Sequence, residues 1–458
     1  MTHKPVPGPK GIPVLGIMLD LAANPAEFLL RTGIAYGDIA RFRLLHFDFY
    51  LVTKPDYVQE VLVTQNEKFR KSPRDVAILS KFLGRGILVT EGTYHKRQRK
   101  LVQPAFHTSR IQNYADTMVD YTRRMIEEWS DGSVQPIDRA MSKLTMEIVA
   151  KSLFDADVTG QAVVVGEAVE TLQSIAGMDI RVQNIIPDWL PLAHNRRRAA
   201  AGATLDRVIR QVISERRASG EEDRGDLLSM LLLSEDEHGA RMTDQEARDE
   251  AVTLFAAGHE TTSNAMTWTW YLLSQYPQIA TNLYAEVDSV LNGRKATLKD
   301  LPNLPYTTMI IKESLRLYPP AWALNVREAA EDVEIDGYLI PKGSSLFVSP
   351  YAVQRSPRYF EDPLTFDPER FSPENEKTIS RYAYFPFGGG PRVCIGNSFA
   401  MMEAQLILAT MAQHVSLSLM SDQVVEIDPQ VTMGTKHELR MRVHTRETVA
   451  QAAAALQP

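Results

Sequence analysis

Phe387-Gly388-Gly389-Gly390-Pro391-Arg392-Val393-Cys394-Ile395-Gly396 is the most constraining stretch of this 458-residue chain. Its three consecutive glycines allow backbone conformations and close approaches that side chains forbid. Cys394, the single cysteine, follows them just before a predicted helix over 397–414. Backbone N–H groups and the positive end of a helix favour a thiolate, so we expect a lowered pKa and an anionic sulfur donor at Cys394.

Two other interpretations of Cys394 fit parts of this pattern. One is a buried structural cysteine beside an ordinary glycine turn, which the long spacing F-x-x-G-x-x-x-C-x-G disfavours. The other is a nucleophilic cysteine enzyme, but no thiol-protease signature surrounds Cys394. A single cysteine excludes intramolecular disulfides and cysteine-cluster zinc or iron–sulfur sites, and it fits a reducing compartment.

The loop resembles the haem-binding loop of the haem-thiolate monooxygenases, the cytochrome P450 family. The matching residues are Phe387, Gly390, Arg392, Cys394 and Gly396. The resemblance implies haem b as cofactor, with Cys394 as the axial ligand of its iron and Arg392 as a partner of a haem propionate. Phe387 and Gly396 are implied as further cofactor contacts.

The resemblance extends over about residues 5–445 and implies a soluble, bacterial-type member. We expect one P450 domain over residues 1–458, with a proline-rich lead at about 1–13 and no fused reductase. The expected fold is mainly α with small β-sheets (α+β), in which a long central helix lies over the haem.

That long helix is predicted from Thr243 to Tyr276, because Thr243 and Glu246 form a capping box and Pro277 ends the pattern. At about 1.5 Å per residue it would run roughly 50 Å. We also expect two short strands within residues 39–53, one on each side of His46 to Asp48, and a hairpin at Asp336-Gly337.

The middle of the long helix, residues 257–262, reads A-G-H-E-T-T and resembles the oxygen-binding motif of the family. Small residues let a helix pass close to a planar cofactor, which implies a contact at Ala257. We expect Thr261 to divert a backbone hydrogen bond and open the helix locally. The resemblance makes Glu260 and Thr261 catalytic, delivering protons with water for O–O cleavage. A zinc motif H-E-x-x-H fails because Ser263 occupies the second histidine position.

Two further motifs resemble those of the family. Glu313 and Arg316 match E-x-x-R, and Arg370 supplies the third member of a buried structural triad. Residues three apart share a helix face, so Glu313 can bind both guanidinium groups.

Haem carries two carboxylates that need basic partners. His95 and Arg99 resemble W-x-x-x-R with histidine in place of tryptophan, and Arg327 resembles an arginine on the strand after the E-x-x-R helix. If His95 and Arg99 point inward, the nearby Lys96, Arg97 and Lys100 would point outward and could help dock an acidic electron donor.

Family position also implies a mostly apolar substrate pocket, so we expect a hydrophobic small molecule: a fatty acid, terpenoid or steroid. The residues expected to line the pocket are Phe82, Leu88, Phe255, Ala256, Trp322, Leu324 and Met433.

The implied reaction is insertion of one oxygen atom from O₂ into this substrate, most simply as a hydroxylation. No flavin or nicotinamide motif is present, since Val393 occupies the last glycine position of G-x-G-x-x-G. We therefore expect electrons from a separate ferredoxin or flavodoxin with its reductase, which draws on NAD(P)H. A peroxide-driven peroxygenase and a haem-binding sensor without turnover are the alternatives.

Charge and hydropathy exclude other classes of protein. The 50 basic and 57 acidic side chains give a net charge of −7, so nothing favours nucleic-acid binding. The uncharged stretch Gly11 to Leu19 is too short to span a bilayer and lacks the flanks of a signal peptide. We expect no membrane span and a cytoplasmic location.

Overall fold

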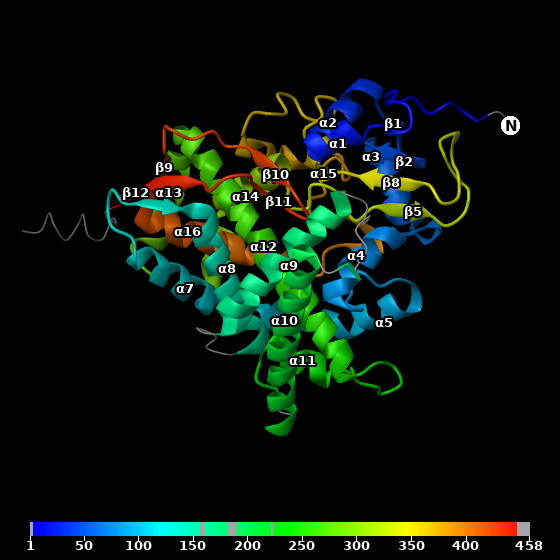
Figure 1. Ribbon diagram of the computed structural model, residues 1–458. Helices are drawn as coiled ribbons and strands as arrows, with labels where there is room; N and C mark the ends of the chain where they lie inside the picture. The colour runs from blue at the N-terminus through cyan, green and yellow to red at the C-terminus, as the bar shows by residue number, and fades with distance from the viewer. Residues whose placement is uncertain (1–2, 156–160, 182–188, 191, 221–222, 447–458) are drawn as a thin grey trace, which may run out of the picture.

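The computed structural model describes residues 3–155, 161–181, 189–190, 192–220 and 223–446 (Figure 1). Residues 1–2 of the predicted lead and residues 447–458 of the predicted domain lie outside this range. The α-helices are α1 (Met18–Ala23), α2 (Pro25–Tyr36), α3 (Pro55–Gln59), α4 (Pro73–Leu83), α5 (Gly92–Val102), α6 (Thr108–Ile111), α7 (Ala115–Glu127), α8 (Ile137–Phe154), α9 (Gln161–Arg181), α10 (Ala193–Ala218), α11 (Leu227–Leu233), α12 (Asp244–Gln275), α13 (Pro277–Leu291), α14 (Pro305–Leu317), α15 (Pro350–Gln354) and α16 (Asn397–His414).

The strands are short and fall into small sheets, as predicted. Their bounds are β1 (Ile39–Leu44), β2 (Phe47–Val52), β3 (Phe69–Lys71), β4 (Val134–Pro136), β5 (Arg327–Ala329), β6 (Val333–Ile335), β7 (Tyr338–Ile340), β8 (Ser345–Val348), β9 (Val415–Leu419), β10 (Ile427–Pro429), β11 (Met433–Thr435) and β12 (Arg440–Thr445). The largest sheet has the order β1-β2-β8-β5-β3, and its strands β2 and β8 run parallel. Another sheet has the order β4-β12-β9, and β6-β7 and β10-β11 are hairpins.

Helix α12 is the centre of the helical part (Figure 1). Its 32 residues begin at the predicted capping box, in which the Thr243 side chain accepts from the Glu246 amide and the Glu246 carboxylate accepts from the Thr243 amide. It packs against α8, α10, α14 and α16, so nearly every turn of it is buried. A helix surrounded in this way can present one short segment to an internal cavity and use the rest as core.

Most of the predicted ends of helices and strands are confirmed. Helix α16 spans the predicted residues 397–414, and Asp336-Gly337 form the turn between β6 and β7. The first hairpin turns at Leu45-His46, slightly earlier than expected, and Leu45 has a positive φ of 56° there. Within the described ranges, no helix combines the length and apolar character that crossing a bilayer requires.

Candidate active site

The glycine-rich loop folds back on itself before α16. The Cys394 amide donates to the Phe387 carbonyl at 3.0 Å, and the Val393 amide donates to the Gly390 carbonyl at 3.0 Å. Gly390 has a φ of +66°, and a Cβ there would collide with the carbonyl oxygen of Leu62. Only glycine satisfies both conditions, so this turn holds Cys394 in one position.

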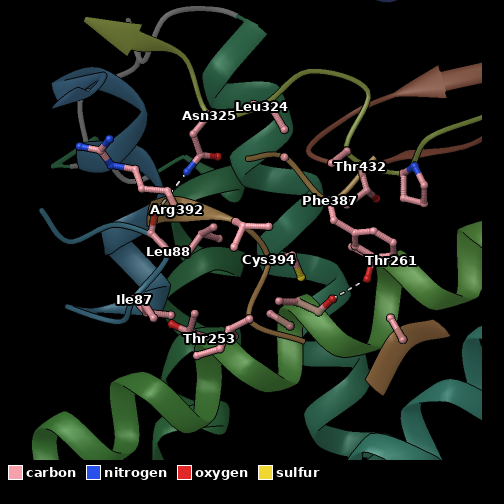
Figure 2. Close-up of a pocket in the computed structure, with 18 of the residues that line it drawn as sticks. Ile87, Leu88, Thr253, Thr261, Leu324, Asn325, Phe387, Arg392, Cys394 and Thr432 are labelled. Atoms are coloured by element: carbon pink, nitrogen blue, oxygen red, sulfur yellow. Dashed lines mark hydrogen bonds between the residues drawn. The ribbon is translucent and has the colours of Figure 1, made fainter. Parts of the chain in front are cut away.

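The Cys394 sulfur points into an internal cavity, toward α12 (Figure 2). Burial within the protein raises the pKa of the Cys394 thiol, whereas the Gly396 amide and the charge of Arg99 lower it. Our prediction of a lowered pKa is therefore wrong for the protein chain, because desolvation outweighs the amide and the helix end. A metal cation bound at the sulfur would favour the thiolate, as in other metal–thiolate sites.

The opposite wall of the cavity is the middle of α12, where Ala257 and Thr261 line it and Gly258 packs on Val149. The Thr261 hydroxyl donates to the Ala257 carbonyl at 2.7 Å (Figure 2). This is the predicted hydrogen bond, but the local opening is absent, since α12 is α-helical throughout. A hydroxyl can share a carbonyl with the backbone amide without displacing it.

The Glu260 carboxyl lies beside this wall and holds a proton readily. Burial raises its pKa, the charge of Glu170 raises it further, and hydrogen bonds from Thr432 and Gln173 lower it. Among the described residues, Glu260 Oε2 has no hydrogen-bond partner. Thr261 lines the cavity, whereas the carboxyl of its neighbour Glu260 is buried beside the wall and does not line it.

His259, which precedes Glu260, faces the core instead. Its ring is 1% exposed, and its Nε2 lies 3.0 Å from Ser142 Oγ and 3.1 Å from the Ser142 carbonyl. Burial lowers the pKa of His259 to about 4. It therefore serves packing between α8 and α12.

Basic side chains gather at one edge of the cavity. His95, Arg99, Arg327 and Arg392 all line it, as predicted. Arg99 donates to the Val393 carbonyl at 2.9 Å, and Arg327 donates to the Asn325 carbonyl at 3.0 Å. In the part of the chain that the structure describes, the buried Nε of Arg327 has no hydrogen-bond partner. Burial lowers the pKa of His95 to about 4, so His95 is neutral and can donate one N–H.

Arg392 is committed to protein groups. Its guanidinium binds Glu91 at 2.7 and 3.1 Å and donates to the Phe69 carbonyl at 3.0 Å. Figure 2 shows it directed away from Cys394. Sequence reasoning missed both Glu91 and Lys71, which also lines the cavity, because no local pattern marks either residue.

These features fit the haem that the sequence predicts. A planar tetrapyrrole needs one donor to its iron, which Cys394 would offer, and room against the opposite wall, where the small side chain of Ala257 lines the cavity. Its carboxylates need cations at one edge, where Arg99 and the unpartnered Nε of Arg327 are available.

The predicted triad forms between α14 and η6 (Pro368–Phe371). Arg316 Nε lies 2.6 Å from Glu313 Oε2, and Arg370 Nε lies 3.4 Å from Glu313 Oε1. Glu313 and Arg316 are 0% exposed. Arg316 also donates to the carbonyls of Gln354 and Pro363, both at 2.7 Å, so the triad ties α14 to the segment that leads into the cysteine loop.

Some of the residues predicted to line the pocket do so, and the others are buried in the core. Phe82, Leu88, Ala256 and Leu324 line the cavity as expected. Phe255 does not, because it lies on the face of α12 that packs into the core beside His259.

Trp322 and Met433 are also wrong as pocket residues. Both are buried in the cluster around α2 and β2, where Trp322 donates to the Gln430 carbonyl at 3.0 Å. Their neighbours Ala323, Val431 and Thr432 line the cavity in their place. A shift of one residue turns the side chain away, which sequence position alone does not resolve.

Comparison with known proteins agrees with this geometry. The model of the family described as Cytochrome P450 matches residues 6–443. Cyclooctatin synthase of Streptomyces melanosporofaciens is 39% identical over 96% of this chain and 95% of its own length. Pentalenene oxygenase of Streptomyces avermitilis is 33% identical over 96% of this chain and 97% of its own.

Among solved structures, the cytochrome P450DA heme domain superimposes with a TM-score of 0.89, at 25% identity, covering 98% of this chain and 99% of that one. Because the sequence match, the fold and a cysteine loop facing the central helix all agree, the chain belongs to the cytochrome P450 family.

Proposed function

We propose that this P450 monooxygenase hydroxylates a cyclic terpenoid, using electrons from a separate ferredoxin or flavodoxin and its reductase. The observation that carries the proposal is the predominantly apolar cavity between Cys394 and α12, whose wall includes Phe82, Leu83, Leu88 and Leu254. Such a wall binds hydrocarbon skeletons by burial and offers few polar anchors. Two relatives are named for oxidation of cyclooctat-9-en-7-ol, at 36% identity, and of pentalenene, at 33%.

In this proposal Cys394 would hold the haem iron, and the guanidinium groups of Arg99 and Arg327 would neutralise the propionates. The neutral His95 would donate one N–H to a propionate. Arg392 would contribute through its ion pair with Glu91. Haem held by a thiolate supplies the activation of O₂, which side chains cannot perform.

The chain's own residues deliver protons and exclude water. The Glu260 carboxyl, whose pKa is raised by burial, is a proton donor beside the cavity, and the Thr261 hydroxyl can relay that proton. Apolar residues of the cavity wall, such as Leu254 and Leu315, exclude bulk water from the reaction.

Electron delivery is proposed to use the exposed surface of α5. Lys96 and Lys100 are exposed there, as expected, and would attract an acidic donor. Arg97 does not belong to this surface, because its guanidinium binds Asp236 at 2.6 Å and Glu246 at 2.9 Å. The single cysteine fits a reducing compartment, and we propose a cytoplasmic location.

The direct test is a ligand and product screen. Haem-loaded protein is titrated with cyclic sesquiterpene and diterpene hydrocarbons, linear fatty acids and steroids, following the spin-state shift of the haem absorption. Hits are then incubated with ferredoxin, reductase and NADPH, and products are identified by mass spectrometry. We expect a shift and a singly hydroxylated product from a cyclic terpenoid. Turnover of fatty acids or steroids alone would refute the substrate class.

Thr261→Ala separates O₂-driven from peroxide-driven chemistry. We expect this variant to lose product with O₂ and reductase but to retain it with hydrogen peroxide. The matched control is Thr267→Ala, since the Thr267 hydroxyl makes the same bond to a carbonyl four residues back, at 2.9 Å, in the core. Equal losses in both regimes would refute the proton-delivery role.

A further inference from the structure

Residues 84–90 join α4 to α5 and form part of the cavity wall. Ile87 and Leu88 line the cavity from this loop, close to the cysteine loop and α12 (Figure 2). Within the described residues the loop forms neither helix nor strand. Its Gly84 amide bonds back to α4, and its Val89 and Thr90 amides donate to the Gly86 carbonyl. Buried N–H and C=O groups need partners, so the way they are satisfied shows what holds the loop.

The amide groups of the loop bind two adjacent carboxylates of α12. The Arg85 amide donates to Asp249 Oδ2 at 2.8 Å, and the Ile87 amide donates to Glu250 Oε2 at 3.0 Å. The backbone lies directly on the helix, because a Cβ at Gly86 would collide with Thr253 Oγ1. One side of the loop is therefore fastened to α12.

The carbonyl groups of the loop bind donors from two other segments. Lys71 Nζ, at the end of β3, donates to the Ile87 carbonyl at 2.9 Å and to the Thr90 carbonyl at 2.8 Å. Asn325 Nδ2 donates to the Leu88 carbonyl at 3.2 Å, the contact drawn in Figure 2. Ile87, Leu88 and Thr90 are thus held by side chains from three segments: α12, the end of β3, and the segment before β5.

These partners are costly groups to bury. Lys71 is 5%, Asp249 3% and Glu250 1% exposed. Burial lowers the pKa of Lys71 to about 7 and raises that of Glu250 to about 8, so solvent would stabilise the charged form of each far better. Apolar contacts would hold a loop with a smaller free-energy penalty for desolvation. Directional hydrogen bonds to the loop backbone instead fix its position.

We propose that Lys71, Asp249 and Glu250 are positioning residues that hold loop 84–90 in place, so that Ile87 and Leu88 determine which carbon of the substrate faces Cys394. The identity of the substrate in this proposal rests on the proposed function. The attachment of the loop to α12 and β3 is independent of it. The three residues act on the same segment. Asp249 and Glu250 of α12 bind the amides of Arg85 and Ile87, and Lys71 of β3 binds the carbonyls of Ile87 and Thr90.

The test compares isosteric variants in the haem-loaded full chain. Glu250→Gln keeps an acceptor for the Ile87 amide, whereas Glu250→Leu removes it. Lys71→Met removes both carbonyl contacts but keeps the length of the side chain, and it serves if Glu250→Leu does not fold. The matched control is Lys68→Met, which removes an exposed lysine three residues earlier.

Three measurements are made on each variant. Hydrogen–deuterium exchange reports the protection of amides 85–90. Optical titration with n-alkylimidazoles of increasing chain length reports how affinity depends on the space beside the haem. The ratio of hydroxylation positions on the substrate found in the screen reports regioselectivity.

We expect Glu250→Leu and Lys71→Met to speed exchange in the loop at least 10-fold, to change the chain-length preference and to change the product ratio. Glu250→Gln and Lys68→Met should resemble the parent. Unchanged exchange overturns the fastening, and faster exchange with unchanged chain-length preference overturns the positioning role. If exchange and chain-length preference change as expected while the parent oxidises no cyclic terpenoid, the positioning role is supported and the proposed substrate class fails.

Discussion

The loss of folding stability in acid should depend on His259, and the size of that loss follows from the burial of its ring. The His259 pKa falls from 6.5 to about 4 on burial, so the folded chain resists a proton that the unfolded chain accepts. Stability supported by the neutral ring is complete above pH 6.5 and is lost as pH falls toward 4. Between pH 7.5 and 5.0, this one group should cost about 2 kcal/mol of unfolding free energy.

The perturbation is His259→Gln, which keeps a polar contact for Ser142 but does not titrate in this range. Urea denaturation at pH 7.5 and 5.0 gives the loss of unfolding free energy on acidification for parent and variant. The variant should lose about 2 kcal/mol less than the parent. His238→Gln, at a side chain that is 83% exposed, is the control and should leave the loss unchanged.

An equal acid-induced loss in parent and His259→Gln would refute the reasoning, because a solvated ring would contribute nothing. A change of the same size in His238→Gln would also refute it, since the effect would then come from net charge. The burial of His95, whose pKa is also about 4, adds a second acid-sensitive group that both proteins share.

Three other changes test the site. Gly390→Ala should cost about 2 kcal/mol or more and reduce haem content in the pyridine haemochrome assay, because the added Cβ meets the Leu62 carbonyl at positive φ; normal haem content would contradict this. Arg316→Met should cost about 3–5 kcal/mol in urea denaturation, because Glu313 is left buried and charged, and an unchanged midpoint would show the pair to be dispensable. Glu170→Gln should lower the pKa of Glu260 and move the alkaline limb of the turnover–pH profile, where the proton donor is lost, to lower pH; an unmoved limb would show that the two carboxyls are uncoupled.

Motifs that act through local geometry could be predicted from the sequence. The capping box at Thr243, the hairpin at Asp336-Gly337 and the glycines before Cys394 each specify a backbone shape within a few residues, and the structure has all three. The E-x-x-R pair is similar, since three residues of helix place Glu313 and Arg316 on one face.

Predictions that needed the direction of a single side chain fared less well. Phe255, Trp322 and Met433 stand beside cavity-lining residues but point into the core, because helix rotation and strand pleat turn successive side chains to different faces. The expected lowering of the Cys394 pKa failed for a related reason. Desolvation depends on everything packed around the thiol, and the loop sequence contains no information about it.

The sequence by itself determined the long central helix, the cysteine loop and the Glu313–Arg316 pair, because their residues act over short, regular spacings. Only the tertiary structure decided that Lys71, Asp249 and Glu250 converge on loop 84–90, or that Arg392 binds Glu91. These contacts join residues between 16 and 301 positions apart at no regular spacing, and no local pattern records them. They depend on how helices and strands pack, which is also what shapes the pocket and selects its substrate.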